Sequence, residues 1–217
     1  MKKIKRIICF CLSFCLLASL FSGCGGVRIK REKGYNCITI KPSDIDYDLQ
    51  TTDKTMQILK KRLDDAQINA AITRKDGDIL FVEVFEQVSD KNLQILCSTG
   101  RLSFKDSAGL EYFNSDHITS AHVEERYDGK GYSVIVKLTK AGVDLLTMAT
   151  RKIKDMEDNT LYIWLGNLQI SAPTVQEQIV TEDVIITNCE SYEDALTLAV
   201  VIDGKNLPVE YTVIETA

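Results

Sequence analysis

Two histidines in the middle of the chain are the first candidates for a chemical role such as metal binding. His117 and His122 lie five residues apart, and Glu124 and Glu125 follow, so one short stretch offers imidazole and carboxylate ligands for a metal ion. The same stretch is predicted to be a strand, however, and positions 117 and 122 point to opposite faces of a strand. We therefore expect structural or solvent-exposed histidines and no metal site.

A serine and several carboxylates are the other candidates for catalysis. Ser171 opens the sequence Ser171-Ala172-Pro173, but no Gly-x-Ser-x-Gly motif surrounds it and no triad partner stands in a supporting motif. The pairs Glu182-Asp183 and Glu193-Asp194 stand where elements are expected to begin, and acidic residues there favour a helix dipole. The sequence after residue 24 has no Gly-rich phosphate loop and no Cys-x-x-Cys pair. We expect a protein that is not an enzyme and needs no cofactor.

The N-terminus divides into a basic zone, an apolar zone and a short run of small residues. Lys2, Lys3, Lys5 and Arg6 precede the apolar stretch 7–21. This is the order of a secretory signal peptide. The apolar stretch, about 15 residues, is shorter than the roughly 20 residues that a membrane-spanning helix needs. We expect residues 1–23 to be removed on export, and an uncleaved anchor is the alternative.

The end of this zone, Leu20-Phe21-Ser22-Gly23-Cys24, resembles the lipobox of bacterial lipoproteins. That resemblance implies a diacylglycerol thioether on Cys24, which becomes the new N-terminus, and acyl chains such as palmitate can hold a protein at a membrane. Phe21 departs from the usual Leu, and an ordinary signal peptide with an incidental cysteine is the alternative. We expect residues 24–36 to be a lipid-anchored tether, with the rest of the chain at the extracytoplasmic face of the cell membrane.

The charge of the chain argues against nucleic-acid binding, and its cysteine spacing argues against a metal site. The chain has 26 basic and 31 acidic residues, and four of the basic ones lie in the expected signal peptide, so nothing indicates a nucleic-acid partner. Cys37, Cys97 and Cys189 remain after Cys24, an odd number with no metal-binding spacing. We expect three buried thiols, and one disulfide among them is the alternative.

Alternating strands and helices are predicted over the first part of the exported chain. Residues 35–41 alternate as a strand, and a helix follows from Thr51-Thr52-Asp53 to about residue 67. Two strand-like runs then flank an Asp-Gly turn, Ser89 begins a short helix that Gly100 is expected to end, and residues 102–104 resume a strand. The order β-α-β-β-α-β is that of a ferredoxin-like unit, so we predict such a lobe over residues 37–105.

A second α+β lobe is predicted over residues 106–217, after a polar break at residues 106–116. Strands at 118–125 and 132–138 flank a turn, and Thr139 caps a helix. Strands at 161–165 and 184–187 follow, then a helix that Ser191 begins and Gly204 ends. A last strand at 207–214 is expected to return toward a sheet edge of the first lobe.

The strand at 161–165 has apolar side chains on both faces. Tyr162 and Trp164 share one face because they are two residues apart, and Ile163 takes the other. We expect helices to cover both faces, and the alternative is that one face is a contact patch for a partner.

Several short motifs occur in a fixed order across both predicted lobes. They are Arg62-Leu63, Val82-Glu83-Val84, Leu102-Ser103-Phe104, Gly166-Asn167, Ser171-Ala172-Pro173, Val175, Ile179, Ile185-Ile186-Thr187, Glu193-Asp194-Ala195, Leu198-Ala199, Leu207-Pro208-Val209 and Ile214-Glu215. Together they resemble the large first periplasmic domain, with its base and head subdomains, of SecD and of fused SecDF. These proteins are membrane-embedded accessory factors of the Sec protein-export channel. The resemblance covers roughly residues 40–215.

The resemblance implies a non-enzymatic module that binds the Sec translocon or unfolded secretory polypeptide at the outer membrane face. Asn188, Phe85 and Gly166 depart from the residues common in the family. The sequence also ends where the family's second membrane-spanning helix would approach, so we expect no proton-driven motion from this chain alone. A structural or scaffold lipoprotein that docks onto an unrelated cell-envelope complex is the alternative.

Overall fold

The computed structural model describes residues 36–43, 49–75, 78–204 and 206–216. The expected signal peptide, the lipid-attachment residue Cys24 and the tether up to residue 35 lie outside these described residues. Within the described part, no helix combines the length and the apolar character needed to cross a membrane. The described residues form three antiparallel sheets with helices, which confirms the predicted α+β class.

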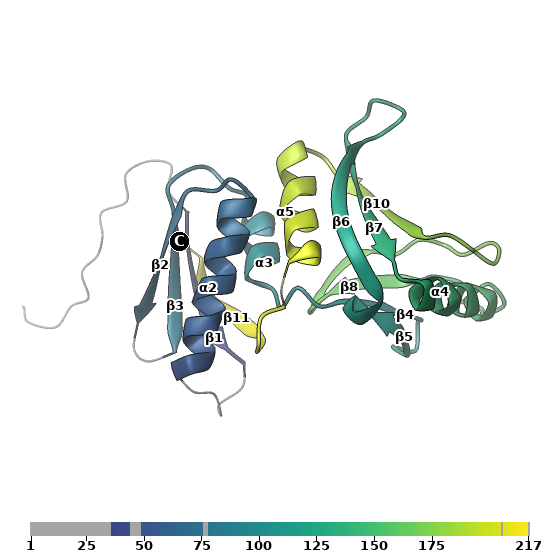
Figure 1. Ribbon diagram of the computed structural model, residues 1–217, viewed down its shortest axis with the longest axis horizontal. Coiled ribbons are helices and arrows are strands. Elements are labelled where there is room, and N and C mark those ends of the chain that lie inside the picture. Colours follow the sequence, from purple (N-terminus) through teal and green to yellow (C-terminus); the bar gives the residue numbers. More distant parts are fainter. Residues whose placement is uncertain (1–35, 44–48, 76–77, 205, 217) are drawn as a thin grey trace, which may run out of the picture. The chain divides into compact units, whose positions relative to one another are not determined.

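The first sheet, called the β1 sheet here, has the strand order β11-β1-β3-β2. It consists of β1 (Asn36–Pro42), β2 (Ala70–Lys75), β3 (Ile79–Val84) and β11 (Tyr211–Thr216). Alternate residues of β3 are buried, as expected of a strand with one face on a core. The helices α2 (Leu49–Asp65) and α3 (Asp90–Cys97) pack beside this sheet (Figure 1). This is a ferredoxin-like arrangement.

The strand that follows α3 lies in a different sheet from the one we predicted. β4 (Leu102–Lys105) pairs with β5 (Glu111–Asn114) and β8 (Tyr162–Leu165), not with the β1 sheet. The C-terminal β11 pairs with β1 and completes that sheet. Sequence periodicity indicates that a strand follows α3, but it carries no information about the partner, because pairing depends on residues far away in the chain.

Two further sheets follow β4 along the chain. The β8 sheet has the order β5-β4-β8-β9, and the β7 sheet has the order β10-β7-β6. Their remaining strands are β6 (Ile118–Glu125), β7 (Tyr132–Leu138), β9 (Leu168–Ser171) and β10 (Asp183–Cys189). The helix α5 (Tyr192–Asp203) packs on β6 and β7 and also contacts α3, while α4 (Lys140–Ile153) contacts β5 and β7 (Figure 1).

The stretch 106–116 is ordered, which corrects the polar break that we predicted there. Asp106 is buried, and its carboxylate accepts hydrogen bonds from the backbone N–H groups of Ala108 and Leu110, both at 3.0 Å, and from the Tyr112 hydroxyl at 3.1 Å. β5 and a short 3-10 helix, Ser115–His117, complete the stretch. Polar residues can be buried in this way because each polar group has a hydrogen-bond partner.

The helix starts at Ser89, Thr139 and Ser191 were predicted correctly, but α2 begins at Leu49, so the Thr51-Thr52-Asp53 cap that we expected lies inside the helix. Ser89, Thr139 and Ser191 each accept a hydrogen bond from the backbone N–H three residues later, which is the expected N-cap geometry. Gly100 does not end α3, however. The helix ends at Cys97 with Ser98 as its cap, and Gly100, with φ +79°, lies beyond it in the connection to β4.

A buried arginine holds the connection between α3 and β4. Arg62 is 2% exposed and donates hydrogen bonds to the carbonyls of Leu96 (2.8 Å), Ser98 (2.6 Å) and Thr99 (3.0 Å). The Thr99 carbonyl also accepts a hydrogen bond from the Leu207 N–H at 2.8 Å. One guanidinium therefore connects α2 to the chain segments that enter and leave the β7 and β8 sheets. Burial lowers the pKa of Arg62 to about 10, so the group remains charged at neutral pH.

The three thiols are buried and free, as we expected. Burial raises the pKa of Cys97 to about 12, although the nearby Arg62 opposes the shift. Burial also raises the pKa of Cys189. Neither group is therefore a reactive thiolate at neutral pH.

Candidate functional site

The β8 sheet has one buried face and one open face. Leu102, Phe104, Ile163 and Leu165 are at most 1% exposed and occupy the buried face. Tyr162 and Trp164 alternate with them along β8, are half-buried, and occupy the other face. Our expectation that helices cover both faces does not hold for this face, which is partly exposed over a cavity.

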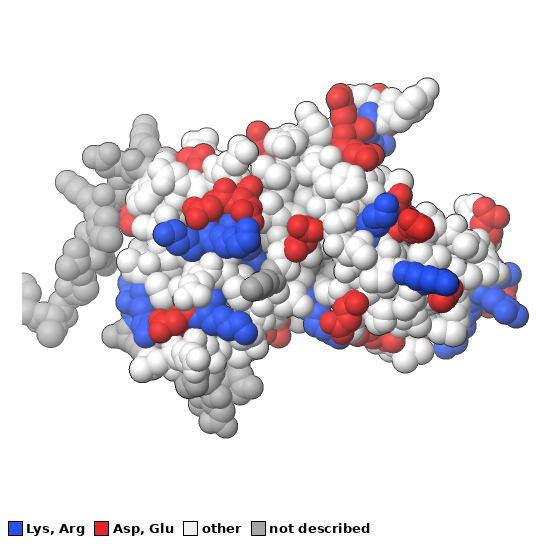
Figure 2. Space-filling model, in the orientation of Figure 1, with Lys and Arg blue, Asp and Glu red and all other residues white. Residues whose placement is uncertain are grey.

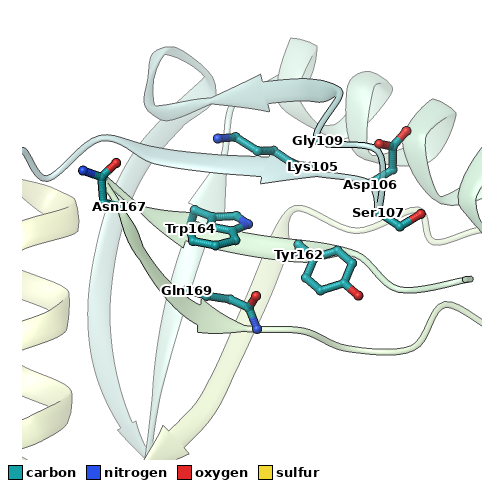
Figure 3. Close-up of a pocket in the computed structure, with 9 residues that line it drawn as sticks. Lys105, Asp106, Ser107, Gly109, Tyr162, Trp164, Asn167 and Gln169 are labelled. Atoms are coloured by element: carbon teal, nitrogen blue, oxygen red, sulfur yellow. The ribbon is translucent and has the colours of Figure 1, made fainter.

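The two aromatic rings form the floor of a cavity of about 340 Å³. Its lining residues are Lys105, Asp106, Ser107, Gly109, Tyr162, Trp164, Gly166, Asn167 and Gln169. Figure 3 shows Trp164 and Tyr162 beside each other along β8, with Lys105 on the β4 side and Gln169 on the β9 side. None of these described lining residues is aliphatic.

The aromatic floor is held in place by polar contacts. The Tyr162 hydroxyl donates to Asp158 Oδ2 at 2.8 Å, and this hydrogen bond raises the pKa of Tyr162. The pKa of Asp158 is lowered, chiefly by a hydrogen bond from Thr160 and also by the one from Tyr162. The Lys105 ammonium lies 5.8 Å from the centre of the Trp164 ring, within the range of a cation–π contact.

The turn between β8 and β9 closes one end of the cavity. Gly166 has φ +57°, and a Cβ there would lie 2.8 Å from Thr99 Oγ1, so glycine suits both the backbone and the packing. Asn167 Nδ2 donates to Glu210 Oε1. A second groove, of about 370 Å³, continues past this turn toward Arg101 and Pro208.

The histidines considered for a metal site engage separate partners. His122 Nε2 lies 3.2 Å from Glu124 Oε1 at an exposed position. His117 lies in the 3-10 helix with its ring edge-on to Phe113, at 6.5 Å between ring centres. Among the residues that the structure describes, no three His, Cys, Asp or Glu side chains are placed to hold a metal ion.

The other candidate chemical groups are likewise dispersed. Ser171 ends β9 opposite Ile163, and within the described ranges its hydroxyl has no histidine or carboxylate partner. Asp194 accepts a hydrogen bond from Asn92 Nδ2 at 2.8 Å, close to the N-terminus of α5. The carboxylates of Glu182 and Asp183 are exposed where β10 begins. These residues show no catalytic arrangement.

Comparison with known proteins tests the resemblance. Residues 107–209 match the family described as SecDF, P1 head subdomain. The protein translocase subunits SecD of Dictyoglomus turgidum and Sebaldella termitidis are 26% and 25% identical over 165 and 173 residues, which cover 75% and 76% of this chain. SecDF of Bacillus subtilis is 27% identical over 135 residues. The chain is SecD-like.

Solved structures agree with this result at the level of the fold. A crystal structure of SecDF in a super-membrane-facing form superposes with a TM-score of 0.59 at 17% identity, over 84% of this chain and 30% of that one. A structure of SecDF, a membrane component that enhances protein export, gives a TM-score of 0.58 at 18% identity, over 82% of this chain and 98% of that one. The SecD-like chain spans about 40% of the length of the SecD relatives that it matches.

Two features of the structure were missed by reasoning from the sequence. The sequence motif that contains Arg62 does not indicate its role. One signal is available, because Arg62 follows Leu59 by three positions and so lies on the apolar side of the helix. Asp106 was assigned to a polar break. The Trp164 face was only an alternative, because the sequence pattern shows that both strand faces are apolar but not what covers them.

Proposed function

We propose that this protein is an extracytoplasmic, non-enzymatic accessory module of protein export. The observation that carries the proposal is the match of residues 107–209 to the SecDF P1 head subdomain, together with the shared fold over most of the described chain. The resemblance to SecD supports a role beside the Sec translocon or the polypeptide that emerges from it.

The same proposal includes membrane attachment through a lipid on Cys24. It is supported by the basic, apolar and small-residue zones that precede Cys24 in the sequence. A short lipid-anchored tether would keep the SecD-like part at the membrane surface, where the export channel opens. On the face drawn in Figure 2, acidic and basic side chains are interspersed and no large basic patch stands out.

Photo-crosslinking in intact cells tests the proposal. A benzoylphenylalanine at position 127 is suited to this, because Tyr127 is fully exposed in the turn between β6 and β7. A second probe at Val180 samples the segment beside α4, where Thr147 Oγ1 donates to the Ile179 carbonyl. We expect adducts with Sec channel components or with secretory polypeptides in transit, and more of the latter when export is slowed.

The outcome that contradicts the proposal is equally specific. A single unrelated envelope protein crosslinked at either position, with no Sec component, would indicate a scaffold lipoprotein that uses a SecD-like fold for another assembly. A probe at the buried position Ile163 is the matched control and should give no intermolecular adduct.

A further inference from the structure

The cavity over Trp164 has a chemical character that differs from a surface for hydrophobic chain segments. Tyr162 and Trp164 are its large apolar residues, and the rest of the lining is polar or glycine. By contrast, the groove between α2 and α5 is lined by Ile58 and Val200 among the stems of longer side chains. Pockets for apolar ligands are lined mainly by hydrophobic and aromatic side chains. The Trp164 cavity has two aromatic rings but no aliphatic residue in its lining, so it suits such a ligand less well than the groove between α2 and α5 does.

Aromatic rings with amide side chains around them suit a sugar polymer. The C–H groups on the face of a sugar ring carry partial positive charge and pack against the negative face of an aromatic ring. Trp164 and Tyr162 are two residues apart on one strand, so their rings offer two platforms about 6.5–7 Å apart along β8. Gln169 and Asn167 are exposed beside them and can both donate to and accept from hydroxyl and N-acetyl groups.

The charge of the cavity specifies the ligand further. The Asp106 carboxylate is buried and already accepts three hydrogen bonds, so it is not directed at a ligand. The Lys105 ammonium lies over Trp164 and, among the described residues, forms no ion pair within 4 Å, although its charge helps to lower the pKa of Glu111 opposite it on β5. A half-buried cation beside an aromatic floor is complementary to a sugar that carries a carboxylate.

We propose that the cavity formed by Trp164, Tyr162, Lys105, Asn167 and Gln169 binds a glycan of N-acetylated amino sugars that carries carboxylates, which is the chemistry of the peptidoglycan strand. Such binding would hold the protein against the cell wall beside its membrane anchor. The inference needs the extracytoplasmic location of the proposed function but not its role in export.

Trp164 makes the test direct, because it is the only tryptophan of the chain. The full chain, purified in a detergent without a sugar headgroup, is titrated with soluble uncrosslinked peptidoglycan strands and with a neutral chito-oligosaccharide. We expect a saturable change of tryptophan fluorescence with both ligands. Binding of the carboxylated strands should weaken as salt is added, and binding of the neutral sugar should not.

Variants locate the site by co-sedimentation with insoluble peptidoglycan. Trp164→Ala should weaken binding at least tenfold. Lys105→Gln should weaken binding of the carboxylated strands more than binding of the neutral chito-oligosaccharide. Tyr127→Ala is the matched control, because it removes an aromatic ring that is fully exposed elsewhere, and it should bind as the unmodified protein does. Circular-dichroism melting of each variant verifies that it is folded.

Three results would overturn the proposal. The first is the absence of any saturable fluorescence change and of co-sedimentation. The second is unchanged binding by folded Trp164→Ala. The third is a saturable change with a reduced, carboxymethylated polypeptide and none with either glycan, which would assign this face to polypeptide. Each is measured with purified components, so none of them contradicts the crosslinking result expected of the proposed function.

Discussion

The Arg62 guanidinium is removed from water, and three backbone carbonyls at the end of α3 replace its hydration. The Thr99 carbonyl also accepts a hydrogen bond from the Leu207 N–H. Removing the side chain would thus leave acceptors in a buried place without their donor. An unmade hydrogen bond of this kind costs more than the bond itself contributes.

Arg62→Met is therefore expected to lower the free energy of unfolding by on the order of 3 kcal/mol, at about 1 kcal/mol for each lost hydrogen bond. Arg101→Met is the matched control. Arg101 makes a two-pronged ion pair with Glu111 at 2.8 and 2.6 Å, but both side chains are partly exposed, so its loss should cost under about 1 kcal/mol. Urea unfolding of the purified proteins measures both. Equal losses for the two variants would contradict the role given to Arg62.

Cys24 is the residue on which membrane attachment is expected to depend. Cys24→Ala should abolish labelling by radioactive fatty acid, because the thioether cannot form. If the lipoprotein signal peptidase is the enzyme that processes this site, the variant should also retain residues 1–23 and migrate as a larger species. An intact Met1 and no lipid in the unmodified protein, measured by mass spectrometry, would instead indicate an uncleaved anchor.

The role of a single residue could be predicted from the sequence when the groups that it contacts lie nearby in the chain. The caps at Ser89, Thr139 and Ser191 depend on residues three positions away, and all three were recognised. Arg62 was not recognised, because its partners Leu96, Ser98 and Thr99 lie on another element. The Trp164 cavity was only an alternative for the same reason, since Lys105 reaches it from β4.

At the scale of elements, the α3–β4 connection accepts only a residue without a side chain at Gly100. Gly100 has φ +79°, and a Cβ there would lie 2.3 Å from Arg62 Nη2 and 3.2 Å from the Val201 carbonyl oxygen. Arg62 cannot easily move aside, because three hydrogen bonds fix it. Glycine is needed here for both its backbone angle and its small size.

Gly100→Ala and Gly109→Ala separate these two requirements. Gly109 also has a positive φ, +81°, but a Cβ there meets nothing within 4 Å. Both variants should lose about 1–2 kcal/mol from the left-handed backbone. Gly100→Ala should lose about 1–3 kcal/mol more from the clash. Urea unfolding gives the difference, and equal losses would mean that Arg62 yields without cost.

The sequence predicts which segments are helices and strands better than it predicts which strands pair with each other. The strand at Leu102–Lys105 was predicted, but not the sheet to which it belongs. That sheet depends on whether β4 pairs with β8, and on β11 occupying the edge of the β1 sheet instead. β11 pairs with β1 across almost the whole described chain, a contact that no local pattern encodes. Its pairing leaves β4 free to become a central strand of the β8 sheet.

At the scale of the whole molecule, the question is whether the β1 sheet and the two later sheets unfold together. Their buried side chains form one continuous core, which includes residues of α2, α3, α4 and α5. Arg62 and Leu207 also donate hydrogen bonds to the same Thr99 carbonyl, which links the α3–β4 connection to the segment before β11. A shared core and shared hydrogen bonds favour a single cooperative transition.

The three buried thiols can test this cooperativity, because they lie in different parts of the core. Cys37 is in β1, Cys97 is in α3 and Cys189 is in β10. Each is 4–6% exposed, so a thiol reagent reaches it only after the surrounding structure opens. If the core unfolds as one unit, all three thiols should become reactive at the same urea concentration. Alkylation at graded urea, quantified for each cysteine by mass spectrometry and normalised to the fully unfolded chain, measures this. Modification of Cys189 at a distinctly lower urea concentration than Cys37 would show that the β7 and β8 sheets open while the β1 sheet stays folded, and would establish two independently stable lobes.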